Sequence, residues 1–387
     1  MMSKPHGIID ADAHVAEPVS MWADYLEPAF KARGPRLAQI SPGGDGPQGF
    51  ASGGLEVDGT SICDRVTGEL EVRSALHLMR AYPEAVRAGW TPASHVASLR
   101  RIGVDMAFLY PTVGSWVFAI DTMESDLAAA LVRAYNRWLH DFCSHDPSFL
   151  RPVGVVCRHD PREMVAEVER NATLGWRAVY LRPNPIRGRL LSDPAYEPFW
   201  SACERLDIAV SVHEGTHARV PTTGADRFNT RFAMHTCSHP MEQMMALLAL
   251  IEGGVMERHP GLRFAFLEAG CGWLPYWLWR LDEEYEQLGW EVKRNVKQKP
   301  SAYFRRQCFV SIEPSEPYLD RIIDLVGEDN LLFGSDYPHM DHGPAALADV
   351  IRTNTQLPPH VMRKILWDNP RRFYGLDRRA EGPSIIG

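Results

Sequence analysis

Short apolar runs recur along most of the chain, and polar or amphipathic segments separate them. Runs of this length without alternation are typical of strands that helices cover on both faces. Eight of them can be recognised: Gly7–Ile9, Val104–Tyr110, Pro152–Cys157, Arg177–Leu181, Ile208–Val212, Arg263–Leu267, Cys308–Ile312 and Asn330–Phe333. The pattern therefore predicts eight buried strands.

Most of the intervening segments carry apolar residues at helical spacing. These segments are Ser125–Cys143, Arg162–Leu174, Glu197–Leu206, Met241–Arg258, Trp273–Leu288, Pro317–Val326 and Pro344–Thr353. Strands that alternate with helices form parallel sheets joined by right-handed crossovers. Eight such units predict an α/β fold of the (β/α)8 TIM-barrel type. A doubly wound open sheet is the alternative, but no Gly-x-Gly-x-x-Gly sequence follows the first strand as a dinucleotide-binding version would require.

A stretch from about residue 30 to 95 interrupts this repeat between the first and second strands. It is rich in glycine and proline, most clearly at residues 41–47. A connection of this length inside a compact domain is usually functional or disordered. We expect a loop-rich insertion that caps the mouth of the barrel. Because no internal repeat and no second core can be recognised, residues 1–387 are expected to form a single domain.

The overall composition narrows the classes of partner and location. The formal net charge is −8 and no basic run occurs, which argues against a nucleic-acid-binding surface. No apolar run approaches the length of a membrane span, and the N-terminus has no signal-peptide core. The seven cysteines form no Cys-x-x-Cys pair, and several lie in apolar stretches, as expected of free thiols in a reducing compartment. We expect a cytoplasmic protein without a nucleic-acid or membrane partner.

Candidate metal ligands follow the predicted strands. The active site of a parallel barrel gathers at the carboxyl ends of its strands. Asp12 and His14 follow the first strand two positions apart, so on extended backbone they share a face. His213 and Asp336 end the fifth and eighth strands. Each could alone be a helix cap or a satisfied core residue, but two imidazoles and two carboxylates at one end of a barrel suit one Zn²⁺, Mn²⁺ or Fe²⁺.

Two further charged residues are expected at the same mouth. Arg182 ends the fourth strand, and its planar guanidinium is suited to bind a substrate carboxylate, with a structural ion pair as the alternative. Glu268 follows the sixth strand, where it is a candidate general base or a partner of a ligand histidine. A salt bridge or a backbone hydrogen bond would also explain Glu268.

Three histidines are additional candidates for proton transfer or substrate binding. His217 and His339 lie just after the fifth and eighth strands and are expected to contact the substrate. His239 immediately precedes Pro240, and a proline at this position predicts the start of a long helix. We therefore expect His239 in a loop over the site, with a catalytic role. The sequence does not rank these three histidines.

Several motifs carry a resemblance to a known family. They are Ile9–His14 (Ile-Asp-Ala-Asp-Ala-His), Val212-His213, Leu332–Pro338 (Leu-Phe-Gly-Ser-Asp-Tyr-Pro), Ala134–Leu139, Leu181–Pro185 and Ile365–Tyr374. Together they resemble the amidohydrolase-related family, which includes the aminocarboxymuconate-semialdehyde decarboxylase-like enzymes, over nearly the whole chain from Ile8 to Leu376. The resemblance implies a TIM barrel with one catalytic metal, and it gives Asp336 two roles, metal ligand and proton shuttle.

The chain departs from the family pattern at two places. Asp12 stands where the first histidine of a His-x-His pair is common, although some decarboxylating relatives have a carboxylate there. Glu268 stands where decarboxylase-like members carry a catalytic histidine, which puts decarboxylation in doubt. No lysine ends the fourth strand, so the resemblance implies a mononuclear centre and no carbamylated lysine.

These observations lead to one main functional prediction and two alternatives. The main prediction is a metal-dependent hydrolase that acts on a small organic acid, amide or ring-cleavage product through metal-activated water. The first alternative is a metal-dependent, non-oxidative decarboxylase of an aromatic or dienoic acid. The second is a barrel without catalytic activity that binds a ligand or partner and needs no metal. A homodimer is also expected, with the aromatic segment Trp273–Trp279 as a candidate interface.

Overall fold

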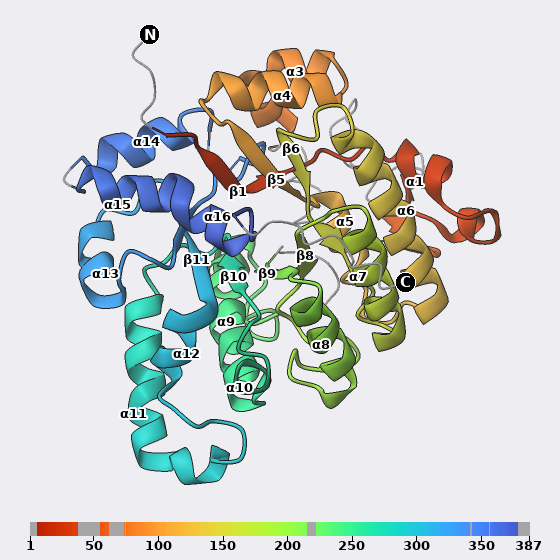
Figure 1. Cartoon of the computed structure of the whole chain (residues 1–387). Coiled ribbons are helices and arrows are strands. Elements are labelled where there is room, and N and C mark those ends of the chain that lie inside the picture. The colour runs from red at the N-terminus through yellow and green to blue at the C-terminus, as the bar shows by residue number, and fades with distance from the viewer. Residues whose placement is uncertain are drawn as a thin grey trace, which may run out of the picture.

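The computed structural model describes residues 6–37, 55–61, 73, 75–214, 222–340, 343–355 and 357–377. Its central feature is a parallel barrel surrounded by helices (Figure 1). The barrel strands are β1 (Ile9–His14), β5 (Met106–Tyr110), β6 (Leu150–Pro152), β7 (Gly154–Val155), β8 (Ala178–Leu181), β9 (Ala209–His213), β10 (Phe264–Leu267), β11 (Cys308–Ile312) and β12 (Leu331–Phe333). They pair in the order β1-β5-β6 and β7-β8-β9-β10-β11-β12, all parallel.

The chain closes this barrel at the junction of its first and last strands. Ala13 pairs with Tyr337 in a parallel bridge. The backbone N–H of His14 donates to the Tyr337 carbonyl over 2.6 Å, and the N–H of Asp336 donates to the Asp12 carbonyl over 2.8 Å. The predicted TIM-barrel fold is confirmed. These bonds also place the ends of β1 and β12, which carry predicted ligands, side by side.

Each of the eight predicted runs contains or adjoins a strand, with two differences in detail. The first strand was predicted at Gly7–Ile9 but runs from Ile9 to His14, because polar residues that face a site can occupy inward positions of a buried strand. The third strand is divided into β6 and β7 at Val153, next to Pro152, which has no N–H to donate to a neighbour. The register of β1 against β5 also shifts between Asp10 and Ala13.

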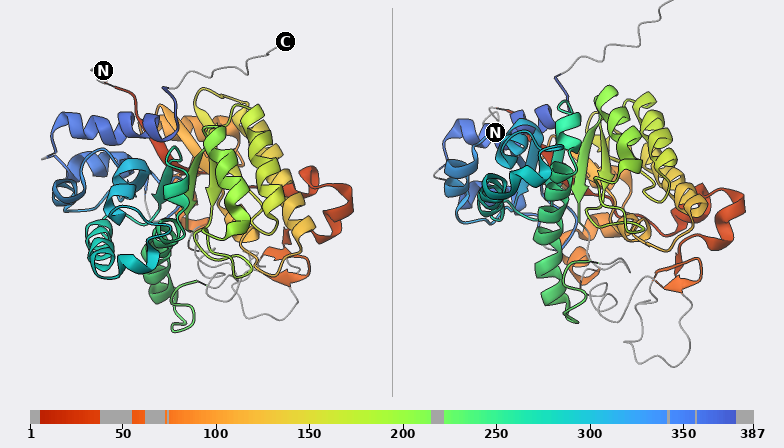
Figure 2. Two further views of the ribbon diagram at one scale, coloured as in Figure 1. Left: turned by 60° about the horizontal axis from the view of Figure 1, so that its bottom comes forward. Right: turned by 90° about the horizontal axis from the view of Figure 1, so that it is seen from below.

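The helices form the outer layer, with α6 to α8 on one side of the barrel and α11 to α15 on the other (Figure 2). The predicted amphipathic segments correspond to α6 (Ser125–Cys143), α7 (Pro161–Thr173), α8 (Glu197–Arg205), α9 (Arg231–Glu252), α11 (Leu274–Val292), α13 (Leu319–Val326) and α14 (Ala346–Thr353). Shorter helices are α1 (Ser20–Tyr25), α3 (Pro83–Arg87), α4 (Pro92–Arg101), α5 (Val113–Val117), α10 (Val255–Arg258), α12 (Pro300–Gln307), α15 (Pro359–Arg363) and α16 (Asn369–Phe373). Within the described residues, no helix is both long and apolar enough to cross a membrane.

The start of α9 corrects one prediction. His239 lies inside this helix and not in a loop, because the helix begins at Arg231 and continues through Pro240. The hydroxyl of Thr230 accepts the N–H of Ala233 and caps the first turn. A proline removes one helical hydrogen bond but does not have to mark the start of the helix.

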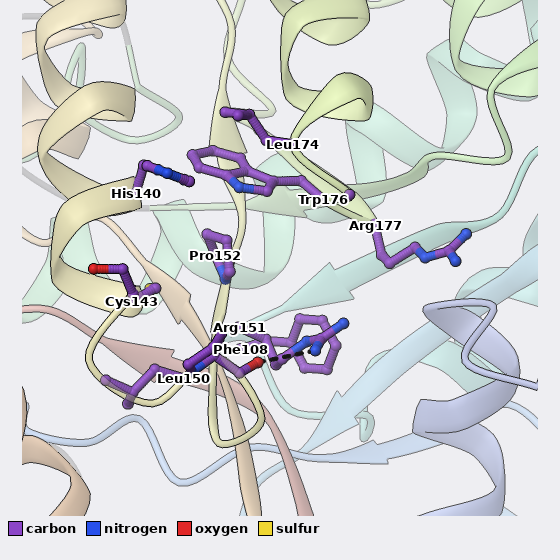
Figure 3. A pocket seen from close by; sticks show the side chains of 12 residues that line it. Phe108, His140, Cys143, Leu150, Arg151, Pro152, Leu174, Trp176 and Arg177 are labelled. Atoms are coloured by element: carbon purple, nitrogen blue, oxygen red, sulfur yellow. Dashed lines mark hydrogen bonds between the residues drawn. The ribbon is translucent and has the colours of Figure 1, made fainter. Parts of the chain in front are cut away.

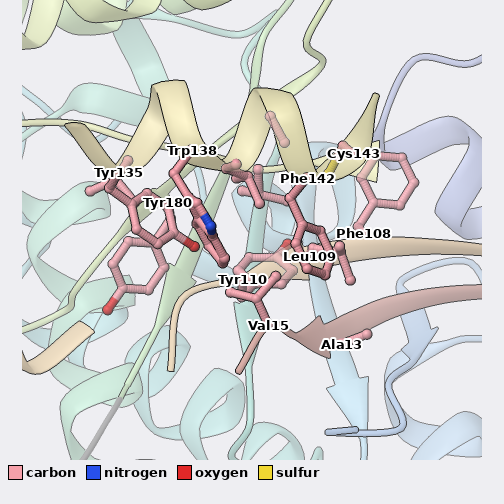
Figure 4. Packing of buried hydrophobic residues seen from close by; sticks show 14 of the residues in the cluster. Ala13, Val15, Phe108, Leu109, Tyr110, Tyr135, Trp138, Phe142, Cys143 and Tyr180 are labelled. Atoms are coloured by element: carbon pink, nitrogen blue, oxygen red, sulfur yellow. The ribbon is translucent and has the colours of Figure 1, made fainter. Parts of the chain in front are cut away.

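The packing of α6 shows how the outer layer holds the strands in place. Tyr135, Trp138 and Phe142 recur at helical spacing and are buried against the strand residues Phe108 and Leu109 (Figure 4). Because these side chains fill one continuous core cluster, they fix the position of β5, whose carboxyl end faces the predicted site.

The described parts of the insertion contain regular structure. Strands β2 (Arg36–Leu37), β3 (Leu55–Val57) and β4 (Thr60–Ser61) form a small antiparallel sheet. Helix α4 is the crossover between β1 and β5, and the rings of Trp90 and His95 pack against Tyr337. Residues 38–54, 62–72 and 74 lie outside the described part of the chain, so the capping role and the single-domain assignment stay predictions.

Candidate metal centre

The structure brings the predicted ligands together at the carboxyl ends of β1, β9 and β12. Asp12 Oδ1 lies 2.9 Å from His213 Nε2 and 3.6 Å from His14 Nε2. His14 Nε2 lies 3.3 Å from Asp336 Oδ1. All four residues are at most 3% exposed. His14 Nε2 therefore lies near carboxylate oxygens of both Asp12 and Asp336 in a buried region, which is the environment that a shared cation requires.

Both imidazoles are oriented by backbone carbonyl groups. His14 Nδ1 lies 3.1 Å from the carbonyl oxygen of Pro111, and His213 Nδ1 lies 2.7 Å from that of Glu214. If each Nδ1 donates its hydrogen, each Nε2 directs a lone pair into the cluster, which is the arrangement of metal-bound histidines. Within the described residues, the buried His14 Nε2 has no hydrogen-bond partner. A cation would satisfy this atom.

Two of the acidic residues are held by unusual backbone geometry. Glu268 and Asp336 follow β10 and β12 and have φ angles of 55° and 51°. This left-handed region is costly for residues with a side chain and concentrates at functional sites. The N–H of Glu268 donates to Ser311 Oγ over 3.0 Å. The backbone thus turns at the end of each strand to present a carboxylate to the cluster.

Asp10 was not predicted as part of the site, but its hydrogen bonds stabilise the segment that carries Asp336. Its carboxylate accepts the backbone N–H of Ser335 over 3.0 Å and the Ser335 hydroxyl over 2.5 Å. Burial raises the pKa of Asp10 to about 7, against the opposing effect of the Ser335 hydrogen bonds. Asp10 therefore ties β1 to the segment that carries Asp336. The sequence signal that could have identified Asp10 is its position in the Asp-x-Asp-x-His motif with Asp12 and His14.

The cluster is electrostatically polarised. Burial and the nearby His339 lower the pKa of His14 to about 3, so this imidazole is neutral at pH 7. Burial alone would raise the pKa of Asp12, but the hydrogen bond with His213 and the charges of His213 and His14 bring it below its ordinary value. Burial opposes a charge on His213 too, yet the carboxylates of Asp12 and Glu268 raise its pKa. Anionic oxygens next to a neutral imidazole are suitable donors for a cation.

The other predicted histidines take different places. His339 Nδ1 lies 2.6 Å from Asp336 Oδ1, and its Nε2 lies 2.9 Å from the hydroxyl of Thr112. His239 is buried on α9, with Nε2 3.4 Å from Glu268 Oε1. His217 falls outside the described residues, so its predicted contact with the substrate stays a prediction.

Arg182 lies in a buried ion pair. Its Nη2 donates to Glu214 Oε1 over 3.0 Å and its Nε donates to Asn184 Oδ1 over 3.1 Å. Arg182 and Glu214 are 3% and 0% exposed. The third nitrogen, Nη1, lies 3.5 Å from the Ser115 carbonyl oxygen. The structure thus shows the ion pair, and the contact of Arg182 with a substrate carboxylate stays a prediction. Sequence reasoning missed Glu214, although it directly follows His213.

A separate cavity lies near the amino ends of β6 and β8 (Figure 3). Its lining includes His140, Arg151, Trp176 and Arg177. None of its lining residues belongs to the cluster, which lies at the opposite, carboxyl ends of the strands. The cavity therefore does not form part of the candidate metal centre.

Sequence comparisons link the chain to decarboxylases. The 2-amino-3-carboxymuconate-6-semialdehyde decarboxylase of Dictyostelium discoideum is 25% identical over 292 residues, which are 74% of this chain and 77% of the relative. The gamma-resorcylate decarboxylase of Polaromonas sp. (strain JS666 / ATCC BAA-500) is 26% identical over 269 residues, which are 66% of this chain and 79% of the relative.

Solved structures share the fold at lower identity. An amidohydrolase from Mycobacterium avium subsp. paratuberculosis K-10 is 19% identical with a TM-score of 0.77, over 96% of this chain and 100% of that chain. A dihydroxybenzoic acid decarboxylase from Polaromonas sp. JS666, with bound manganese and the inhibitor 2-nitroresorcinol, is 19% identical with a TM-score of 0.63, over 96% and 98%. The sequence profile of the amidohydrolase family matches residues 9–376. Because this match spans nearly the whole chain, the protein belongs to the amidohydrolase family.

Proposed function

We propose that the protein is a metal-dependent decarboxylase that removes CO₂ without oxidation from an aromatic or dienoic acid. The observation that carries the proposal is a pair of buried donor groups that share His14, one with Asp12 and His213 and the other with Asp336, in a chain whose matched relatives are decarboxylases. The main prediction from sequence was a hydrolase. The same cluster would serve a hydrolase as well, but the relatives favour the decarboxylase, which was the first alternative.

The donor set fits a single divalent cation. Asp12, His14, His213 and Asp336 would hold the ion, and His14 Nε2 would gain the partner that the described residues do not provide. When bound, the ion supplies positive charge that orients and polarises a substrate oxygen. Zn²⁺, Mn²⁺ and Fe²⁺ all suit imidazole and carboxylate ligands. Manganese is bound in the solved dihydroxybenzoic acid decarboxylase, and the oxygen donors in this chain favour such an ion.

The remaining steps are assigned to residues of the chain. Arg182 would bind the substrate carboxylate through Nη1, whose contact with the Ser115 carbonyl oxygen is long, at 3.5 Å. In decarboxylation the bond between the ring or diene carbon and CO₂ breaks, and that carbon takes up a proton. Asp336 is the proposed proton donor to this carbon. His339, 2.6 Å from Asp336, would return the proton to it from the side of Thr112.

Burial supports this assignment, because water competes poorly in a closed site. His239 and Glu268 form a second pair beside the cluster, 3.4 Å apart. In the hydrolase alternative Glu268 would be the general base that activates water. For the decarboxylase we propose that His239 positions Glu268, which leaves proton donation to Asp336.

A substrate panel with two readouts tests the proposal. The metal-loaded protein should release CO₂ from hydroxybenzoates or dienoic acids, and Asp336→Asn should lower that rate by about 10²–10⁴-fold, as expected for loss of a general acid. Asp320→Asn, an exposed change on α13, is the matched control and should retain the rate. Metal-dependent cleavage of an amide or ester without any CO₂ release would instead support the hydrolase. No turnover and no metal retention would support a non-catalytic barrel.

A further inference from the structure

The carboxylate of Glu268 lies close to both imidazoles of the predicted metal ligands. Its Oε2 atom is 3.1 Å from His213 Nε2 and 3.8 Å from His14 Nε2. These are the two nitrogens that face the carboxylates of Asp12 and Asp336. The same small volume is therefore bounded by a third carboxylate.

The two oxygens of Glu268 have different surroundings. Oε1 faces His239 on α9, over 3.4 Å, while Oε2 faces the two imidazoles of the cluster. His239 thus contacts the oxygen of Glu268 that does not face the two imidazoles. Residues that do not themselves bind a metal commonly orient a metal ligand in this way. The left-handed backbone at Glu268, with φ of 55°, fixes this direction at the end of β10.

We propose that Glu268 is a further ligand of the divalent cation, so that the ion is held by two imidazoles and three carboxylates. This inference rests on the metal centre proposed above and goes beyond it by assigning the ligand set and the metal preference. Glu268, His14, Asp336 and His339 offer donor atoms that all lie within 4.8 Å of one another, as do Asp12, His14 and His213. His14 belongs to both groups, so one ion beside it is within reach of Glu268 and of Asp12.

The charge of the cluster supports the assignment. Three carboxylates in one buried volume repel one another, and a divalent cation between them offsets that repulsion. Hard oxygen donors favour Mn²⁺ relative to a site rich in imidazole or thiolate. The proposed ligand set therefore predicts that Glu268 contributes more to the binding of Mn²⁺ than to that of Zn²⁺.

The affinity for one metal does not distinguish a metal ligand from a residue that only orients the ligands, because loss of either residue weakens metal binding. The informative quantity is the ratio of the dissociation constants for Mn²⁺ and Zn²⁺, measured on the full-length apoprotein by competition with a chromophoric chelator. Glu268→Gln should weaken Mn²⁺ binding by at least about 100-fold, which is the largest loss expected when a residue that only orients the ligands is removed. It should also change the ratio of the two dissociation constants in favour of Zn²⁺ by about 10-fold or more. Glu268→His should recover Zn²⁺ binding but not Mn²⁺ binding.

Glu242→Gln is the matched control. Glu242 is buried on α9 and accepts the N–H and the hydroxyl of Thr223, so it tests loss of a buried carboxylate outside the cluster. It should leave the ratio unchanged. A Mn²⁺-loaded crystal structure of the unaltered protein provides a readout that needs no variant. It should place a Glu268 oxygen within direct bonding distance of the ion.

Two results would overturn the inference. One is an unchanged Mn²⁺ to Zn²⁺ ratio in a folded Glu268→Gln variant. The other is a Glu268 oxygen outside bonding distance in the Mn²⁺-loaded structure. Either result, with one ion still bound by the unaltered chain, leaves the proposed metal centre intact. If the unaltered chain binds neither ion, the metal centre itself fails.

Discussion

Gly334 offers a sharp test of how closely β1 and β12 must approach at the site. A Cβ atom added at this position would lie 2.5 Å from Cβ of Asp12 and 3.4 Å from its Oδ2. Carbon atoms in contact normally lie about 3.5–4.0 Å apart, so Gly334→Ala creates an overlap of about 1 Å with Asp12. Gly334 does not have a positive φ, so the change tests crowding without backbone strain.

The overlap sets the size of the expected effects. Overpacking a well-filled interior typically costs about 1–3 kcal/mol, and we expect Gly334→Ala to lower the free energy of unfolding by that amount. The chain must therefore shift either Asp12 or the end of β12. A displacement of about 1 Å at a reacting site can cost about 10²-fold in rate, so we expect about 100-fold slower CO₂ release.

Urea unfolding and CO₂ release from the metal-loaded protein measure the two effects separately. Gly343→Ala is the control, because it lies in the same connection between β12 and α14 and an added Cβ there meets no atom of the described residues within 4 Å. It should match the unaltered protein in both assays. If Gly334→Ala unfolds at the same urea concentration and releases CO₂ at the same rate, the close approach of β1 and β12 does not support the site.

Three further changes probe the surroundings of the site. Arg182→Met should cost about 3–5 kcal/mol in urea unfolding, because it removes the guanidinium that forms an ion pair with the buried carboxylate of Glu214. Tyr110→Phe removes a buried hydroxyl that bonds two others inside the barrel, and it should cost about 1–3 kcal/mol in the same assay. Burial raises the pKa of Glu167 above its ordinary value, against the hydrogen bond from Asn136. The folded state therefore retains a proton that the unfolded state releases above about pH 4.5, and stability should fall as pH rises through the folded-state pKa. The glutamine introduced by Glu167→Gln has no group that titrates in this range. Urea unfolding should therefore show that the stability of the Glu167→Gln variant, relative to the unaltered protein, increases as pH rises.

Each of these changes has an internal comparison. Adding Glu214→Gln to Arg182→Met should recover part of the lost stability, and no recovery would contradict a charge-pair explanation. Glu169→Gln, an exposed change on the same helix as Glu167, should not show this gain in stability. If Tyr110→Phe is as stable as the unaltered chain, its hydroxyl does not contribute to the barrel interior.

The strand positions could be predicted because burial on both faces leaves a local signature. A run such as Ile208–Val212 must be apolar wherever it lies in the barrel, and β9 begins one residue later. The grouping of Asp12, His14, His213 and Asp336 followed from topology alone, since parallel strands direct their carboxyl ends to one face. These predictions needed no knowledge of individual contacts.

The remaining features depend on contacts between distant segments, which periodicity does not encode. Asp10 bonds Ser335, and Arg182 bonds Glu214, across gaps in sequence that no local pattern reveals. His239 was misplaced because proline is favoured in the first turn of a helix, whereas here α9 tolerates Pro240 in its interior. The oligomeric state and the cytoplasmic location stay predictions.

The most direct test of the account is a titration of the apoprotein with Mn²⁺ while CO₂ release from a hydroxybenzoate panel is followed. The shared cluster predicts that the rate rises linearly and reaches a plateau at one ion per chain, and that His213→Ala removes the rise. CO₂ release that does not depend on added metal, or a His213→Ala variant that titrates like the unaltered protein, would contradict the account.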